Sequence, residues 1–167
     1  MAHFCVHCGH PLRPVVIEEQ ELEGCRSCGF VLWRDPKVVT MVVVEAEGGI
    51  ALARRGLEPG YGHWCLPGGF VNQGEHPAEG AARECLEEIG ARVEILDLLG
   101  VYHIRKVGAP SMVAIGYRGR IASGESLSAG PEMLEVGVFP VQRLPGLAFP
   151  SHAEAMLDWS AKRESAG

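Results

Sequence analysis

Five acidic side chains and one arginine crowd the stretch between residues 69 and 91. Three of the acids, Glu84, Glu87 and Glu88, would lie within about 100° of one another if this stretch is helical. Like charges at this spacing repel one another and destabilise a helix unless a cation lies between them. Carboxylate ligands suit Mg²⁺ or Mn²⁺, which also accept phosphate oxygens. The stretch therefore predicts a divalent-metal site for phosphate chemistry.

The same stretch carries the signals of a helix over residues 77–89. Pro77 suits the first helical position, and Gly90 suits the left-handed residue just past the end. Apolar residues recur at three- and four-residue steps and must lie on a core: Ala78, Ala81, Ala82, Cys85 and Ile89. Upstream, Pro67-Gly68-Gly69 and Gly74 form a glycine-rich loop in which the backbone can approach a ligand closely. The carboxylates are thus expected on a short helix that follows a ligand-binding loop.

Seven residues of this stretch resemble the Nudix box, the signature motif of the Nudix hydrolases. They fit the pattern G-x5-E-x7-R-E-U-x-E-E-x-G-U, where U is bulky and apolar, at Gly69, Glu75, Arg83, Glu84, Glu87, Glu88 and Gly90. Cys85 and Ala91 are smaller than the usual residues at the U positions, and Asn72 stands where many members carry glutamate. None of these departures removes a catalytic group. A solvated acidic helix surface is the alternative for any single pair of glutamates, but not for the whole motif.

The resemblance implies an enzyme that hydrolyses a nucleoside diphosphate linked to another group, with Mg²⁺ or Mn²⁺ as the catalytic cofactor. By position in the motif, Glu84 and Glu88 would hold metal directly. Glu87 would be a further ligand or a base, and Gly68 would contribute its backbone carbonyl. The metal would neutralise the phosphate oxygens and activate the attacking water.

Two further kinds of group are implied around these ligands. Arg83 and Glu75 would form an orienting pair, because a bidentate arginine fixes the geometry of a carboxylate. The motif does not fix the general base, since family members use either a box glutamate or one from a later loop. The loop before the last expected strand offers Glu132 and Glu135. We favour Glu132 as an additional metal ligand or as the base.

The substrate is expected to be a small dinucleotide or nucleotide sugar. The chain resembles a subgroup of Nudix enzymes that carry an N-terminal zinc ribbon and act on ADP-ribose, FAD or NADH. Residues 148–151 match only the end of the array found after the box in NADH pyrophosphatases, and Pro110 lies too far along for the ADP-ribose pattern. Gly69, Phe70 and Tyr102 are the candidate substrate contacts.

Two other functions stay open: an RNA 5′-end decapping enzyme acting on NAD caps, and a non-catalytic nucleotide sensor. The net charge is −6, and no cluster of Lys and Arg forms a basic stripe. This balance disfavours nucleic acid as a partner, because affinity for it comes from neutralising phosphates. A sensor would usually have lost box glutamates, and here all of them are present.

Four of the six cysteines form two Cys-x2-Cys pairs separated by sixteen residues: Cys5, Cys8, Cys25 and Cys28. This spacing indicates a tetrahedral zinc site of the ribbon type. Disulfides are the poorer interpretation, because the N-terminus has no secretory signal. Residues 15–17 and 20–23 suggest a short hairpin between the pairs, too small to fold without metal. The ribbon could serve as a structural staple, as a contact in a homodimer, or as a lid.

The elements around the motif indicate an α/β fold, and the resemblance implies an α/β/α sandwich with a mixed sheet. We expect a zinc ribbon over residues 1–34 and a hydrolase domain over 35–167. Apolar, β-branched runs predict strands at 38–44, 50–54, 93–102, 112–118 and 136–139. Ser151 and Glu154 have the spacing of a capping box and predict a closing helix to about residue 162. No apolar run is long enough to cross a bilayer, so we expect a cytoplasmic enzyme without a membrane partner.

Overall fold

The structure is a computed structural model, and it describes residues 3–104 and 111–165. Pro110 therefore lies outside the described residues. The chain divides into two compact units, Met1–Asp35 and Pro36–Gly167. Each unit is described by itself below.

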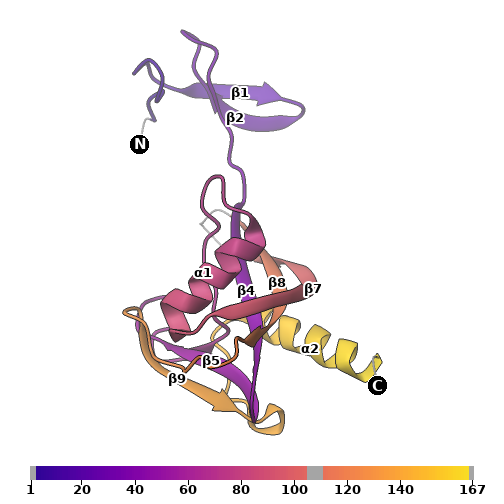
Figure 1. Cartoon of the computed structure of the whole chain (residues 1–167). Coiled ribbons are helices and arrows are strands. Elements are labelled where there is room, and N and C mark those ends of the chain that lie inside the picture. The colour runs from indigo at the N-terminus through magenta and orange to yellow at the C-terminus, as the bar shows by residue number, and fades with distance from the viewer. Residues whose placement is uncertain (1–2, 105–110, 166–167) are drawn as a thin grey trace. The chain divides into compact units, whose positions relative to one another are not determined.

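The first unit is a three-stranded antiparallel sheet, of which Figure 1 labels β1 and β2. Its strands are β1 (Arg13–Ile17), β2 (Gln20–Gly24) and β3 (Val31–Leu32). The two-residue turn of the β1–β2 hairpin has positive φ at both Glu18 and Glu19, as in a type I′ turn. The cluster of buried residues in this unit consists of Cys5, Leu12 and Cys25. So small a core predicts that the unit needs metal to stay folded.

The second unit is built on a six-stranded mixed sheet in the order β6-β5-β4-β8-β7, with β9 paired to β5. The strands are β4 (Lys37–Ala46), β5 (Gly49–Arg55), β6 (Trp64–Cys65), β7 (Val93–Ile104), β8 (Met112–Ile121) and β9 (Met133–Phe139). β4 and β8 run parallel, whereas the other pairs are antiparallel. The remaining elements are α1 (Pro77–Ile89), a 3-10 turn at Val141–Arg143 and α2 (Pro150–Ser165).

Side-chain alternation along β4 separates the core into two layers. Val42 and Val44 pack with the buried face of α1, whereas Met41 and Val43 pack with α2 on the other face of the sheet. Figure 1 shows the two helices on opposite sides of the strands. The expected α/β/α sandwich with a mixed sheet is therefore confirmed.

Helix α1 begins and ends where the sequence predicted, at Pro77 and Ile89. Gly90 ends it in the left-handed conformation with φ of 67°, and its N–H donates to Leu86 O. The sequence did not predict the N-terminal cap, which is His76: its ring accepts a hydrogen bond from the N–H of Ala78. These caps fix which turn of the helix carries each glutamate.

Helix α2 differs at its start from the expected capping box. It begins at Pro150, so Ser151 lies inside the first turn, where it is buried. Trp159, on the buried side of the helix, donates from Nε1 to Glu45 Oε1 at 2.8 Å. Within residues 3–104 and 111–165, no helix is long and apolar enough to cross a membrane.

Candidate active site

The glycine-rich loop is held along β4 by backbone hydrogen bonds. The N–H of Thr40 donates to Gly69 O at 2.7 Å, and the N–H of Val42 donates to Pro67 O at 2.9 Å. Gly68 lies between them with φ of 154°, and a Cβ there would overlap the carbonyl oxygen of Thr40. Glycine is therefore required at this position both by conformation and by space.

Two carboxylates of α1 meet this loop. A Cβ at Gly69 would lie 2.5 Å from the carboxylate carbon of Glu84. The N–H of Gly68 donates to Glu88 Oε2 at 2.9 Å. The glycine-rich loop and α1 thus meet where Gly69 approaches Glu84 and where Gly68 bonds to Glu88.

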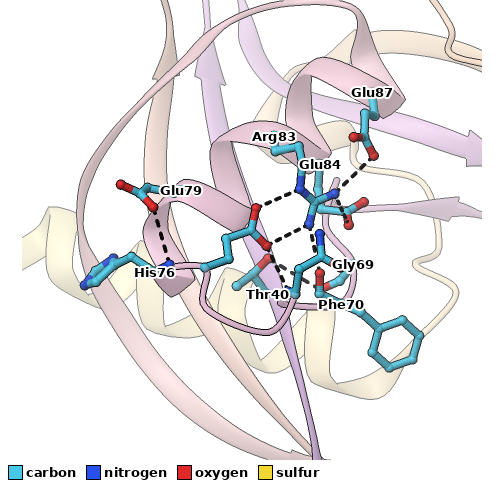
Figure 2. A network of polar contacts seen from close by, with 10 residues as sticks. Thr40, Gly69, Phe70, His76, Glu79, Arg83, Glu84 and Glu87 are labelled. Carbon is cyan, nitrogen blue, oxygen red and sulfur yellow. Dashed lines mark hydrogen bonds and ion pairs between the residues drawn. The ribbon is translucent and has the colours of Figure 1, made fainter.

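Arg83 lies at the centre of a network of acids (Figure 2). Its guanidinium binds Glu75 with two parallel hydrogen bonds, from Nε at 2.8 Å and from NH2 at 3.0 Å. NH1 donates to Glu84 at 2.8 Å and to Glu87 at 3.1 Å, and NH2 also donates to Phe70 O at 2.9 Å. One arginine therefore fixes the positions of three carboxylates and of the loop backbone.

Glu75 is held in its ionised form by these contacts. The hydrogen bonds from Arg83, together with the N–H of Asn72 at 2.9 Å from Oε2, lower the pKa of Glu75 to about 2. Glu75 is therefore a permanent anion that locks the orientation of Arg83. This is the orienting pair that the sequence predicted, although its contribution to activity stays a prediction.

Glu88 is the most buried carboxylate of the cluster, with 7% of its surface exposed. Burial, with smaller effects of the charges of Glu84 and Glu132, raises the pKa of Glu88 to about 7. The N–H of Gly68 and the charge of Arg55 act in the opposite direction. The protein surroundings alone therefore stabilise the Glu88 anion poorly. A metal cation bound in the cavity would supply the missing stabilisation.

These residues line a cavity of about 580 Å³. This volume lies within the range of small-molecule sites. The lining residues are Arg55, Gly68, Gly69, Phe70, Asn72, Glu84, Glu87, Glu88, Pro131 and Glu132. Four carboxylates, three from α1 and one from the loop before β9, therefore share one cavity with the glycine-rich loop.

The two loop acids considered from the sequence are separated by the structure. Glu132 lines the cavity. Glu135 lies in β9, does not line the cavity, and is 3.6 Å from Arg54 NH1. Of the two, Glu132 is the one placed to act on a bound ligand.

Tyr102 is not at this cavity, which corrects its place among the expected substrate contacts. Its side chain is 6% exposed and belongs to the core layer between the sheet and α2. Its hydroxyl donates to Asp158 Oδ2 at 2.7 Å. Gly69 and Phe70 do line the cavity, and the Phe70 side chain is exposed.

Arg55 is a cavity residue that the sequence reasoning missed. Among the described residues that line the cavity, it is the one with a cationic side chain. Its Nε donates to Pro59 O at 2.7 Å, and its Cζ lies 5.1 Å from the ring centre of Phe149. Strand alternation alone did not indicate it, because the register of β5 against β9 shifts between Arg54 and Arg55.

The four cysteines of the first unit come together as one cluster. Their sulfur atoms all lie within 4.8 Å of one another, close to the edge of about 3.8 Å of a tetrahedron with zinc–sulfur bonds of about 2.3 Å. Hydrogen bonds from the N–H groups of Cys28 and Ser27 lower the pKa of the Cys25 thiol to about 6. The cluster does not include His7, whose ring packs at a tilt against Phe30, or His10, whose Nδ1 contacts Cys8 O. The donor set fits a structural zinc ion.

A family model of the NUDIX domain matches residues 34–159. The match covers the glycine-rich loop, α1 and all of the cavity residues. The chain belongs to the Nudix family. The resemblance based on seven motif residues is thus confirmed over most of the chain.

Several Nudix proteins are similar to this chain over most of its length. An ADP-ribose pyrophosphatase of Methanocaldococcus jannaschii is 32% identical over 86% of this chain and 82% of that protein. A Nudix hydrolase of Nitrosomonas europaea has a crystal structure with a TM-score of 0.86 and 31% identity, covering 97% of this chain and 92% of that one. An NAD-capped RNA hydrolase of Chromobacterium violaceum is 30% identical over 88% of this chain, which spans about half, 53%, of that protein.

The protein is accordingly a Nudix hydrolase of the pyrophosphohydrolase type, and membership of the family implies a divalent metal. The cavity fits such an ion. The acidic side chains that line it offer carboxylate oxygens, and the described residues of its wall include neither an imidazole nor a thiol. This is the donor set that Mg²⁺ and Mn²⁺ prefer.

Proposed function

We propose that this Nudix hydrolase cleaves the diphosphate linkage of a nucleoside diphosphate derivative, with ADP-ribose as the first candidate and FAD and NADH as the others. The observation that carries the proposal is the convergence of four carboxylates and Arg55 on one cavity of about 580 Å³. A diphosphate needs positive charge on its oxygens before water can attack it, and carboxylates can hold the required cations.

Glu84 and Glu88 are the proposed ligands of the catalytic metal, with Glu87 and the backbone carbonyl of Gly68 as further ligands. When bound, Mg²⁺ or Mn²⁺ neutralises phosphate oxygens and lowers the pKa of a coordinated water. The burial of Glu88 keeps bulk water away from one side of the site. Its hydrogen bond from the N–H of Gly68 engages Oε2 and holds the carboxylate in place.

Arg83 and Glu75 are proposed as positioning residues. Arg83 holds one oxygen of Glu84 at 2.8 Å, so the other oxygen is oriented by the same contact. Glu75 fixes the plane of the Arg83 guanidinium through two parallel hydrogen bonds. Together they hold the Glu84 side chain in one rotamer before metal binds, so binding costs less side-chain entropy.

The substrate is proposed to contact three groups around the carboxylates. Arg55 places a positive charge at the cavity wall, where it can bind a phosphate oxygen. Phe70 is 52% exposed at the cavity, where its ring can stack on a base or nicotinamide. Gly69 lets the substrate approach the backbone closely. Glu132 is the proposed base that takes a proton from the attacking water, with Glu87 as the alternative.

ADP-ribose is placed before the larger substrates because of the extent of the similarity. The pyrophosphatase of Methanocaldococcus jannaschii is covered over 82% of its length, so nearly all of that enzyme has a counterpart here. NAD-capped RNA is the second candidate, supported by 30% identity to the hydrolase of Chromobacterium violaceum. However, this chain covers only about half, 53%, of that protein. Its net charge of −6 also disfavours RNA binding, because RNA carries a negative charge on each phosphate.

The test is a substrate panel of ADP-ribose, FAD, NADH, NAD, diadenosine polyphosphates and NAD-capped RNA, with Mg²⁺ or Mn²⁺ and identified products. The proposal predicts hydrolysis of ADP-ribose to AMP and ribose 5-phosphate, lost on addition of EDTA. Preferential release of capped-RNA products would support the second candidate. Nucleotide binding without turnover of any substrate would refute the proposal and favour a sensor.

A further inference from the structure

Glu132 stands on a tight turn that leads into β9. The N–H of Met133 donates to Gly130 O at 3.0 Å and closes the turn, with Pro131 and Glu132 as its two central residues. Proline is favoured at the first central position because its φ is already set. The position of the Glu132 carboxylate in the cavity is therefore decided by what holds the ends of this turn.

One end of the turn is bonded to the C-terminal end of α1. The N–H of Gly130 donates to Glu88 O at 3.0 Å, and the N–H of Ser128 donates to Ile89 O at 2.9 Å. Carbonyls in the last turn of a helix lack partners within the helix. The loop before β9 supplies hydrogen-bond donors to two of these carbonyls. One of them belongs to Glu88, whose side chain lines the cavity.

The other side of the turn is bonded to the end of β5. The N–H of Gly56 donates to the backbone carbonyl of Glu132 at 2.8 Å. Glu132 is thus fixed from two directions, by α1 through Gly130 and by the residue after β5 through Gly56.

Both clamps require glycine for lack of space. A Cβ on Gly130 would overlap the carbonyl oxygen of Glu87, and a Cβ on Gly56 would lie 2.8 Å from the carbonyl oxygen of Glu132. Neither residue has a left-handed φ, so an alanine at these positions is opposed by contacts and not by backbone conformation. Gly146 differs, since a Cβ there would meet nothing within 4 Å.

We propose that Gly130 and Gly56 are positioning residues that act through Glu132: their close backbone contacts hold its carboxylate at the wall of the cavity. The inference rests on the proposed function, in which Glu132 takes part in hydrolysis. A methyl group demands a shift of a few tenths of an ångström at Gly56 and of more than about 1 Å at Gly130, where the Cβ would lie 1.7 Å from Glu87 O. Either shift moves the carboxylate from its productive position.

The test compares Gly130→Ala, Gly56→Ala and the control Gly146→Ala, each alone and combined with Glu132→Gln. We expect kcat to fall by about 10–100-fold in Gly130→Ala and by about 3–10-fold in Gly56→Ala, with KM within about twofold. Gly146→Ala should retain wild-type kcat. The residual activity of Glu132→Gln is measured over hours at high enzyme concentration. In this background, each glycine variant should change the residual kcat by less than about twofold.

Multiplicative losses in the double variants would overturn the inference, because the glycines would then act on something other than Glu132. Wild-type kcat in Gly56→Ala and Gly130→Ala would overturn it as well. If Gly130→Ala does not fold, as judged by circular dichroism, the Gly56→Ala pair decides the outcome. If Glu132→Gln is as active as the wild-type enzyme, Glu132 has no role in the reaction and the inference fails. The proposed hydrolysis would still stand.

Discussion

The backbone N–H of Gly68 donates a hydrogen bond to Glu88 Oε2 at 2.9 Å. This contact joins the glycine-rich loop on β4 to the most buried acid of α1. In the part of the chain that the structure describes, no arginine binds Glu88 as Arg83 binds Glu75, and burial raises the pKa of Glu88 to about 7. The N–H of Gly68 and the charge of Arg55 together do not offset the burial of this charge, so this carboxylate is the one most in need of a further cation.

Glu88→Gln should therefore abolish turnover without unfolding the protein. Glutamine keeps an oxygen that can accept from Gly68, but it removes the charge that would bind metal. We expect kcat to fall by at least about 100-fold, with an unchanged melting temperature in EDTA. Steady-state kinetics and thermal unfolding check this, with Glu94→Gln, an exposed glutamate of β7, as the control. A fully active Glu88→Gln enzyme would defeat the proposed metal site.

Arg83→Lys should weaken the site although it preserves charge. Lysine cannot make the two parallel bonds to Glu75 and also reach Glu84 and Glu87. We expect a loss of about 10–100-fold in activity or Mn²⁺ affinity. The matched control is Arg92→Lys, because Arg92 also binds a glutamate, Glu125, but outside the cavity. Equal effects of the two changes would contradict a positioning role for Arg83.

Arg55→Met tests the proposed contact with substrate phosphate. A charge-assisted hydrogen bond of about 1.5–3 kcal/mol would be lost, which corresponds to a fall of about 10–150-fold in kcat/KM. Arg54→Met is the control, because the neighbouring Arg54 bonds to Gly62 O and does not line the cavity. If the Arg54 variant loses as much kcat/KM as the Arg55 variant, the contact is not with substrate.

Cys5→Ser should reduce zinc content and stability more than catalysis. The four sulfurs converge within 4.8 Å, and the unit has too small a core to fold without metal. We expect less than one zinc per chain by elemental analysis. We also expect loss of the thermal transition in which the unit Met1–Asp35 unfolds. Cys85→Ala, a buried cysteine of α1 outside the cluster, should leave zinc content at one per chain. An unchanged zinc content in Cys5→Ser would refute the ribbon assignment.

His152 gives the protein a predicted acid sensitivity. Its Nδ1 accepts from the N–H of Leu66 at 3.0 Å, so the ring must stay neutral there. Burial, with a smaller effect of Arg55, lowers the pKa of His152 from 6.5 to about 4. The unfolded chain then binds more protons between these values, so stability is complete above pH 6.5 and is lost as pH falls toward 4. The loss is on the order of 3 kcal/mol at most.

The measurement is urea unfolding at pH 7.5 and pH 5 of the wild type and of His152→Gln. Glutamine can still accept from Leu66 but does not titrate in this range. We expect the wild type to lose more stability than the variant on acidification. Equal losses in both proteins would show that His152 does not titrate as argued.

Features set by local chemistry could be predicted from the sequence. Pro77 and Gly90 bracket α1 because a proline suits the first helical position and a glycine the left-handed end, whatever surrounds them. The box glutamates came together in one cavity because their spacing on a helix is fixed. The cysteine pairs likewise formed one cluster from their spacing alone.

Features set by tertiary packing could not be predicted in this way. Tyr102 follows register shifts in β7 between Ile95 and Asp97 and between Leu98 and Gly100, and each shift can change the face on which later residues lie. Arg55 became a candidate only once β5 was known to run under α1. The same holds for Gly130. Only glycine fits there because a Cβ would overlap the carbonyl oxygen of Glu87, which lies in the last turn of α1, far away in the sequence.

The central claim is that the acids of α1 hold divalent metal against a nucleoside diphosphate. The direct test is an anomalous difference map from crystals grown with Mn²⁺ and a non-hydrolysable ADP-ribose analogue. We predict a manganese peak within about 2.5 Å of carboxylate oxygens of both Glu84 and Glu88, in contact with the diphosphate. A map with the analogue bound and no manganese beside these two residues would contradict the account.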